Sequence, residues 1–304
     1  MDEKLIWNER PSLKDPVMLV GFTGWLDGGE ASTGPIDYLL HKLPVRRLAE
    51  IPMVDYLAYQ LPGMEFLRPH VETEDGLIAD VVYPSSLFHY WHDEDRKRPH
   101  DLVLWRGAEP VLRWQEYIEL ALSLVEQMGI KRVYSVGGVL DATPHSREPI
   151  VSCGLSDLAL KAELENYAVT YSNYKGPSTF NSALLYACSR KGIEAIHLTG
   201  RCTYYPDFNI SIPHNPKVIY ALLRRLNRLI GMGLDLSDLD QASREMEARL
   251  NGIMARNARL KRYVEELEKN FVEVPYSEPI EGTAQDFVDD VEEFLRRQLR
   301  SDQE

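Results

Sequence analysis

Residues 17–40 read VMLVGFTGWLDGGEASTGPIDYLL and hold the first structural unit of the chain. Residues 17–22 form a short apolar run that ends before Gly24, and such a run predicts a buried strand. Over residues 31–43 the apolar side chains recur at helical spacing, so a helix is predicted there. A strand that passes through a glycine-rich loop into a helix is the repeating unit of α/β folds.

The same alternation continues along the chain and predicts the fold class. Further strands are predicted at residues 47–51, 77–83, 101–105, 132–136, 168–171 and 195–199, and further helices at 114–128, 155–166, 178–191 and 215–231. This order predicts an α/β protein whose mostly parallel sheet lies between helices. Because such sheets bind ligands beyond the carboxyl ends of their strands, the loops at 24–30, 137–147 and 202–209 are expected to meet at one edge.

The sequence changes character after Gly233. Residues 235–271 carry no strand signal and predict a long helix, in which Gly252 is a weak point that costs about 1 kcal/mol relative to alanine. A link containing prolines leads to a last amphipathic helix, predicted at 284–300. We therefore expect an α/β/α main domain over residues 1–232 and a helical C-terminal extension over 233–304, which covers the main domain or pairs with a partner.

Composition limits the classes of partner. The 304 residues are 44% hydrophobic and 27% charged, as in a soluble globular protein with a sizeable core. The formal net charge of −13 disfavours binding to nucleic acid and to anionic membranes. No apolar stretch approaches the roughly 20 residues needed to span a bilayer, and the first residues do not read as a signal peptide. Three cysteines without a CxxC pair predict reduced thiols, so a cytoplasmic protein is expected.

The glycine-rich loop is predicted to be a structural turn. It matches neither GxGxxG nor GxxxxGK[ST] and holds no lysine for a phosphate. Asp27 and Glu30 would repel an anion, whereas acidic side chains are favourable at a helix N-terminus. No nucleotide or other cofactor is therefore expected.

The segment HYWHDEDRKRPH (89–100) offers several potential metal ligands. Its spacing does not direct them to one point, and three consecutive basic residues would oppose a cation. An exposed charged loop without a metal is predicted instead.

Two stretches near the expected edge leave alternatives open. In GGVLDATPHSREP (137–149), His145 is either a general base oriented by Asp141 or a hydrogen-bonded loop residue, and the second is favoured. There is no GxSxG element in the chain. In CTYYPDFN (202–209), the aromatic side chains predict either a protein contact or packing beneath the C-terminal helices.

Four segments, taken in order over residues 16–240, resemble the proteasome assembly chaperone 2 family in its archaeal and actinobacterial form. The first three segments are GFTGWLDGGEAS, LWRGAEPVLRWQEY and GGVLDATPHSREP. The fourth is YKGPSTFNSALL, followed by TYYPDFN and PHNPK. The site residues that carry the resemblance are Gly24, Trp25, Asp27 and Gly29 in GFTGWLDGGEAS, Glu109, Pro110 and Trp114 in LWRGAEPVLRWQEY, Pro144, His145 and Arg147 in GGVLDATPHSREP, and Tyr204 and Tyr205 in TYYPDFN. Two positions depart from the pattern, with Gly28 in place of alanine and Glu148 between the usual arginine and proline.

The resemblance implies a three-layer α/β/α fold like that of nucleoside phosphorylases and related hydrolases. It also implies self-association, with trimers common among bacterial-type members. In eukaryotes and archaea the family helps to assemble the proteasome α-ring. No catalytic residues are established for the family, so none are carried over to this chain.

Three functional hypotheses follow. The first is a non-enzymatic, cytoplasmic assembly factor that forms a homo-oligomer, with a trimer expected and proteasome α subunits as candidate partners. The second is a small-molecule hydrolase or nucleoside-phosphorylase-like enzyme with a site at Asp27, His145 and Arg147, where Arg147 would hold an anionic group. The third is a structural scaffold that assembles through its C-terminal helices.

Overall fold

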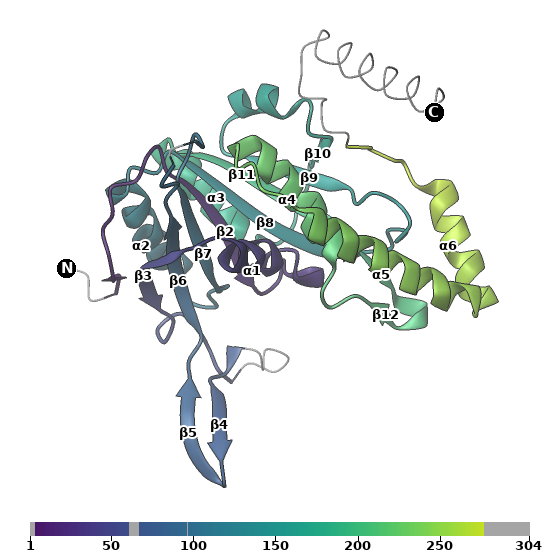
Figure 1. Cartoon of the computed structure of the whole chain (residues 1–304), viewed down its shortest axis with the longest axis horizontal. Helices are drawn as coiled ribbons and strands as arrows, with labels where there is room; N and C mark the ends of the chain where they lie inside the picture. The colour runs from purple at the N-terminus through teal and green to yellow at the C-terminus, as the bar shows by residue number, and fades with distance from the viewer. Residues whose placement is uncertain (1–3, 61–66, 96, 277–304) are drawn as a thin grey trace, which may run out of the picture. The chain divides into compact units, whose positions relative to one another are not determined.

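Figure 1 shows the computed structural model of the chain, which describes residues 4–60, 67–95 and 97–276. The strands are β1 (Ile6–Trp7), β2 (Val17–Thr23), β3 (Arg46–Pro52), β4 (His70–Glu74), β5 (Leu77–Val82), β6 (Ser85–Trp91), β7 (Leu102–Ala108), β8 (Arg132–Asp141), β9 (Val151–Leu155), β10 (Val169–Tyr171), β11 (Glu194–Tyr205) and β12 (Ile210–Ser211). The α-helices are α1 (Thr33–Lys42), α2 (Trp114–Gln127), α3 (Phe180–Lys191), α4 (Pro216–Ile230), α5 (Ser237–Ala255) and α6 (Ala258–Asn270). All belong to the unit Met1–Val274, and Pro275–Glu304 form a second unit.

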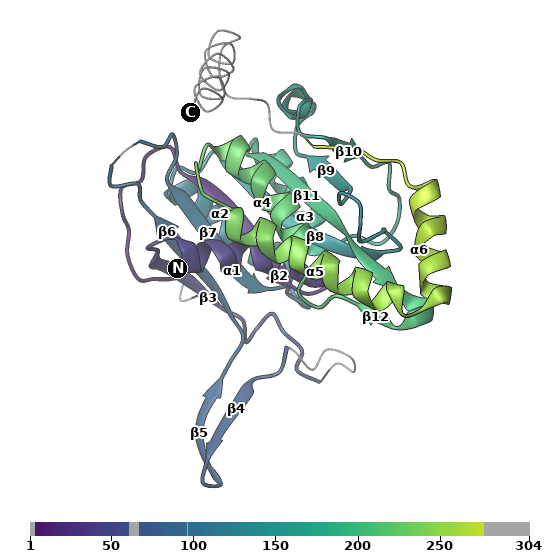
Figure 2. The ribbon, with the colours of Figure 1, turned by 45° about the vertical axis from the view of Figure 1, so that its right-hand side comes forward.

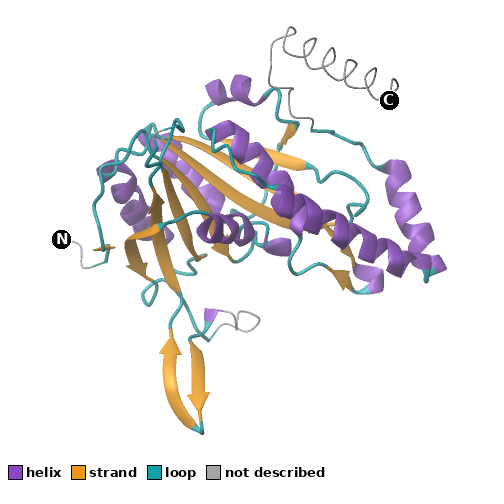
Figure 3. Ribbon diagram, viewed as in Figure 1, coloured by secondary structure: helices purple, strands orange, loops and turns teal. Residues whose placement is uncertain are grey.

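A ten-stranded mixed sheet forms the middle layer, in the order β1-β3-β6-β7-β2-β8-β11-β9-β10, with β12 paired to β11. Its four central strands, β7, β2, β8 and β11, run parallel. Strands β6 and β9 flank them antiparallel, and β3 pairs antiparallel with β6. Helices α1 and α4 contact each other on one face, and α2 and α3 on the other (Figure 3). The predicted three-layer α/β/α fold with a mostly parallel sheet is confirmed.

Strand β2 shows how closely the layers pack. Phe22 points to the α2–α3 side, where its ring centroid lies 5.0 Å from that of Phe180. Gly21 points to the other face, where an added Cβ would lie 2.1 Å from the backbone oxygen of Ser32. The Ser32 hydroxyl accepts a hydrogen bond from the Phe22 N–H (2.9 Å) and donates one to the Val136 carbonyl (2.8 Å). Glycine at position 21 therefore lets the start of α1 approach the middle of the sheet.

The segment predicted as an exposed loop at 89–100 is partly a buried strand. Strand β6 extends to Trp91 and pairs antiparallel with both β3 and β7. The charged residues that follow are folded by hydrogen bonds, since buried Asp101 accepts from the His92 ring (2.7 Å) and from the Lys14 N–H (2.6 Å). The exposed-loop prediction was wrong because the charged residues obscured the apolar alternation before them.

Several boundaries also differ from the predictions. Strands β8 and β11 run 10 and 12 residues, so they include parts of the loops predicted at 137–147 and 202–209. In place of the α-helix predicted at 155–166, strand β9 ends at Leu155 and a 3₁₀ helix follows at Leu158–Leu164. The long C-terminal helix breaks at Asn257, whose side chain caps α6, and not at Gly252. The helix predicted at 284–300 lies outside the described residues, and the domain boundary after residue 232 stays a prediction.

The strand predicted at 77–83 is present, but it does not belong to the central sheet. Strands β4 and β5 pair only with each other, as a separate two-stranded sheet. Figures 1 and 2 show this hairpin standing away from the three layers.

Candidate functional site

At the edge where three loops were predicted to meet, the glycine-rich loop contacts the extended strands β8 and β11. The Gly138 N–H donates to the Leu26 carbonyl (2.6 Å), and the Cys202 thiol donates to the Gly28 carbonyl (2.9 Å). The Gly29 carbonyl accepts from the Asn215 N–H (2.9 Å), which ties the first loop to the start of α4. The glycine-rich loop is thus held from both sides by hydrogen bonds to its backbone.

A hollow of about 200 Å³ opens beside the glycine-rich loop, and we call it the Trp25 hollow. It is lined by Gly24, Trp25, Leu67, Glu109, Pro110, Val111, Trp114 and Ser178. Five of these residues carry the family resemblance, and they come from segments about 85 residues apart in the chain. The structure therefore brings the first two segments of the resemblance to one place.

The Glu109 carboxylate joins the two sides of this hollow. Its Oε2 accepts a hydrogen bond from the Trp25 N–H (2.7 Å), and its Oε1 accepts one from the Phe180 N–H (3.1 Å) at the start of α3. A Cβ at Gly24, whose φ is +155°, would lie 2.5 Å from the same Oε2, so glycine leaves room for the carboxylate. An acidic side chain at a helix N-terminus is also electrostatically favourable.

Two tryptophans line the hollow in different ways. The Trp114 indole N–H donates to the Pro110 carbonyl (2.6 Å), and its ring meets Phe180 edge to face at 5.6 Å. Trp25, by contrast, is 76% exposed although its backbone is fixed by Glu109. A fixed backbone that presents an exposed indole beside an apolar hollow is the kind of surface that carries binding energy at protein interfaces.

A second, much smaller hollow lies next to it and shares Glu109 as a wall. Asn181 lines this space and is only 4% exposed, yet its Oδ1 accepts no hydrogen bond from the described part of the chain. Sequence reasoning missed Asn181. The signal was weak, because Asn181 stands three residues after the start of the helix predicted at 178–191. It is buried against Phe22 and Glu109, which are distant in sequence.

Asp27 has the structural role expected for an acidic residue in the loop. Its carboxylate accepts hydrogen bonds from the N–H groups of Ser32 (3.0 Å) and Thr33 (2.9 Å) and from the Thr33 hydroxyl (2.9 Å). Burial raises the pKa of Asp27 to about 6, and the hydrogen bonds from Thr33 and Ser32 oppose that rise. Asp27 thus caps the start of α1.

His145 is buried beneath helix α5, at 1% exposure. The Tyr205 hydroxyl accepts from the His145 N–H (2.9 Å), so it donates its own proton to Nδ1 (2.8 Å). That assignment leaves the proton on Nε2, which donates to the Asn251 side-chain oxygen (3.1 Å). Burial lowers the pKa of His145, so the ring is a neutral connector between β11 and α5.

The three residues of the enzyme hypothesis have separate partners. Arg147 lies 3.8 Å from Glu273, Asp27 caps α1, and His145 bonds Tyr205 and Asn251. Among the hydrogen bonds and ion pairs of the described residues, none joins any two of Asp27, His145 and Arg147.

The aromatic loop packs against helix α6. Tyr205 is 1% exposed, and its ring centroid lies 5.7 Å from that of Tyr263. Phe208 meets the same ring at 5.5 Å, while Tyr204 is half-buried. For Tyr205 and Phe208 the structure therefore matches the alternative of packing beneath the C-terminal helices.

Pro144 and Gly29, the remaining residues that carry the resemblance, support the local fold. Pro144 is buried next to His145, and Gly29 has a left-handed φ of 63° with Asn215 against it. Within residues 4–60, 67–95 and 97–276, no group of three or more His, Cys, Asp or Glu side chains is arranged to hold a metal ion. None of the helices in these ranges combines the length and apolar character required of a membrane span.

Comparison with known proteins gives matches over most of the chain. The model of the PAC2 family matches residues 21–254. A proteasome-assembly chaperone homologue from Mycobacterium tuberculosis is 26% identical, with a TM-score of 0.71 over 82% of this chain and 99% of its own. A PAC2 family protein from Streptomyces avermitilis is 29% identical, with a TM-score of 0.69 over 82% of this chain and 100% of its own.

A more distant structure agrees in fold alone. An archaeal proteasome activator from Pyrococcus furiosus is 19% identical, with a TM-score of 0.62 over 82% of this chain and 97% of its own. The comparison with curated proteins gave no match. The resemblance recognised from the four sequence segments is confirmed by the family model and the structural matches.

Proposed function

The chain belongs to the PAC2 family, and from that premise we propose that it is a non-enzymatic assembly factor that binds a protein partner at the Trp25 hollow. The partner class we propose is the proteasome α subunit, since one similar structure is named a proteasome-assembly chaperone homologue and another a proteasome activator. The protein would act in the cytoplasm as a homo-oligomer, with a trimer as the expected form.

One observation carries this proposal, namely the exposed indole of Trp25 beside a preformed apolar hollow. Tryptophan is enriched among the residues that dominate binding energy at interfaces. Because Glu109 already holds the Trp25 backbone, less ordering entropy is lost when a partner binds. A space of about 200 Å³ accommodates one aliphatic or aromatic side chain of the partner.

The surroundings of the other motif residues favour binding over catalysis. His145 is buried and hydrogen-bonded through both ring nitrogens, which leaves neither free to exchange a proton with a substrate. Asp27 and Arg147 are engaged elsewhere. Within the same proposal, residues 1–232 are the main domain and 233–304 its C-terminal extension, of which helix α5 covers the main domain where Asn251 bonds His145.

The proposal is tested by affinity purification of the tagged full-length protein from its native lysate, followed by mass spectrometry. Wild type is compared with Trp25→Ala and with Tyr186→Ala, a control that removes an aromatic ring 69% exposed on α3. We expect α subunits with wild type and the control, and at least about tenfold less with Trp25→Ala, because hot-spot truncations cost about 2 kcal/mol or more. Equal recovery with all three proteins would contradict the proposal.

A further inference from the structure

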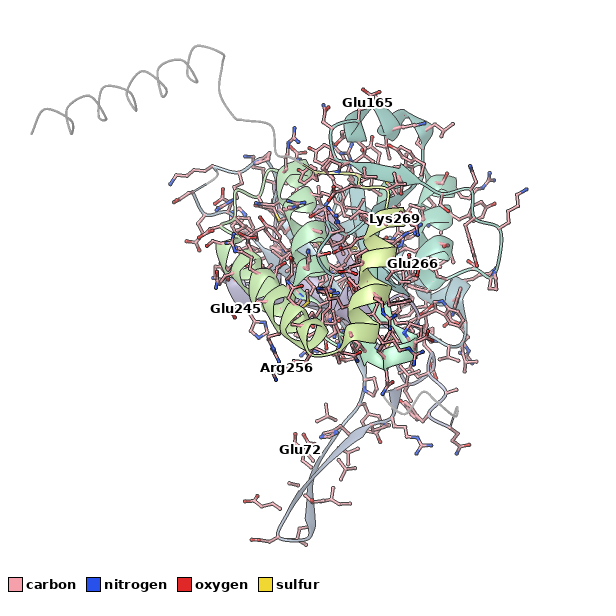
Figure 4. All side chains as sticks on the ribbon, turned by 90° about the vertical axis from the view of Figure 1, so that its right-hand side faces the viewer. Glu72, Glu165, Glu245, Arg256, Glu266 and Lys269 are labelled. Carbon is pink, nitrogen blue, oxygen red and sulfur yellow. The ribbon has the colours of Figure 1, made fainter. Side chains whose placement is uncertain are left out.

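The β4–β5 hairpin is an arm with no cover from the rest of the described chain. Its strands form their own sheet and turn at Asp75 and Gly76, which both have positive φ. Residues 70–80 are all exposed. Figure 4, which labels Glu72 on the hairpin and Arg256 after the end of α5, shows it standing clear of the α5 and α6 helices.

The pairing register gives the hairpin two different faces. Val71 pairs with Val81 and Thr73 with Ile78, so these side chains share one face. We call Val71, Ile78 and Val81 the apolar face of the hairpin. The opposite face holds the pairs His70–Val82, Glu72–Asp80 and Glu74–Leu77, and it carries the acidic side chains of the two strands. Ile78 is 67% exposed, which is a large uncovered surface for a branched apolar side chain.

An isolated two-stranded hairpin is marginally stable in water. This hairpin therefore needs a covering surface, and a second copy of the same chain is present wherever the hairpin is. The sequence of the arm, HVETEDGLIADVV (70–82), contains four acidic residues and no lysine or arginine. The covering surface should therefore be apolar and carry basic residues.

The chain itself offers such a surface along helix α5. A groove of about 570 Å³ runs between this helix and the segment before α4. Its apolar lining includes Ile212, Pro213, Met246, Leu250 and Ile253, and we call it the α5 groove. Ile253 is 49% exposed there.

The charges around the α5 groove suit an acidic arm. Arg249 lines the groove and Arg256 follows the end of the helix, and neither forms an ion pair within the described ranges. Glu245 also lines the groove and accepts a hydrogen bond from the Gln241 amide (2.9 Å). In a chain of net charge −13, copies repel one another unless opposite local charges meet.

We propose that the apolar face of the hairpin of one copy lies in the α5 groove of a second copy. The inference rests on the self-association proposed above and assigns its contact. Because the two surfaces differ, each copy offers one arm and one groove, which is a head-to-tail contact that closes into a ring such as a trimer.

The first test measures the mass of the full-length protein in solution by sedimentation velocity. Ile78→Asp is compared with Leu77→Asp, a matched control because Leu77 is the adjacent residue, is 75% exposed and faces the acidic side. We expect Ile78→Asp to raise the dissociation constant at least about 100-fold, since it removes a buried apolar side chain and buries a charge. Leu77→Asp should change it less than about threefold.

The second test establishes the head-to-tail arrangement by mixing. Ile253→Asp breaks the groove, while Ile78→Asp breaks the arm, so each variant alone should be monomeric. In an equimolar mixture, the intact arm of the Ile253→Asp copy meets the intact groove of the Ile78→Asp copy. A heterodimer is then expected, and it cannot grow further because its free ends are the two altered surfaces.

The outcomes separate this inference from the proposed function. A monomeric wild type overturns both the arm contact and self-association. It does not bear on partner binding at the Trp25 hollow, which the affinity purification tests. An oligomer unaffected by Ile78→Asp overturns the arm contact alone. Two monomeric variants that fail to combine overturn the head-to-tail arrangement. An Ile253→Asp variant that still associates overturns it too and points to pairing between two arms.

Discussion

Replacing Glu109 with alanine removes the carboxylate that joins the two sides of the Trp25 hollow. Glu109 accepts two backbone hydrogen bonds, from Trp25 (2.7 Å) and from Phe180 (3.1 Å). A hydrogen bond to a charged group contributes about 1.5 kcal/mol or more to stability. Since the exposed Trp25 N–H regains part of its loss by bonding water, we expect the free energy of unfolding to fall by about 2–3 kcal/mol.

The assay is urea unfolding of the full-length protein at one fixed concentration, because self-association makes stability depend on concentration. Glu109→Gln retains one acceptor oxygen and should lose about half as much, roughly 1–1.5 kcal/mol. Glu165→Ala is the control, since this glutamate is exposed, as Figure 4 shows, and should change stability by less than about 0.5 kcal/mol.

The expected result is a lower midpoint of unfolding with an unchanged slope. If Glu109→Ala is as stable as the Glu165→Ala control, the carboxylate does not hold the hollow together and the reasoning is refuted. If Glu109→Ala loses α-subunit binding while the Glu165→Ala control retains it, the preformed shape of the hollow is needed for docking.

Three further predictions concern the layers and the first loop. Gly21→Ala should destabilise by at least about 2 kcal/mol in the same urea assay, because its Cβ would lie 2.1 Å from the Ser32 carbonyl oxygen. Gly252→Ala should stabilise by about 1 kcal/mol, since no atom lies within 4 Å of its added Cβ and alanine is the better helix former. The raised pKa of Asp27, about 6 against an unfolded value near 3.9, means that the unfolded chain loses this proton first as pH rises. The measurement is the difference in unfolding free energy between wild type and Asp27→Asn. The stability of wild type relative to the variant should be greatest below pH 4 and fall by up to ~3 kcal/mol by about pH 7. A difference that does not change with pH would contradict the raised pKa of Asp27.

Local signals predicted most of the central fold. Helix α4 begins and ends where its caps indicate, with Asn215 accepting from the Val218 N–H (3.2 Å) and Gly231 in the left-handed region. The apolar runs of β2 and β7 and the amphipathic pattern of α2 were equally clear. In these elements, propensity, caps and hydrophobic pattern agree, so tertiary structure adds little information.

The predictions that failed concern features that depend on residues far apart in the chain. Strand β6 is followed directly by a run of charges, which obscured its buried alternation. Tyr205 reads as an exposed loop aromatic until helix α6 is placed over it, and no local pattern indicates that cover. The Trp25 hollow was anticipated only as a set of motif residues. Its joining element, a single carboxylate between the first loop and α3, is visible only in three dimensions.

The most direct test of the central claim is site-specific photo-crosslinking at position 25. A photoactivatable phenylalanine analogue replaces Trp25 in one protein and Tyr186 in a control, since both side chains are well exposed, at 76% and 69%. After irradiation of native lysate, covalent products are identified by mass spectrometry. We predict a crosslink between position 25 and a proteasome α subunit, and none from position 186. Capture of α subunits equally from both positions, or from neither, would contradict the claim that the Trp25 hollow is the docking surface.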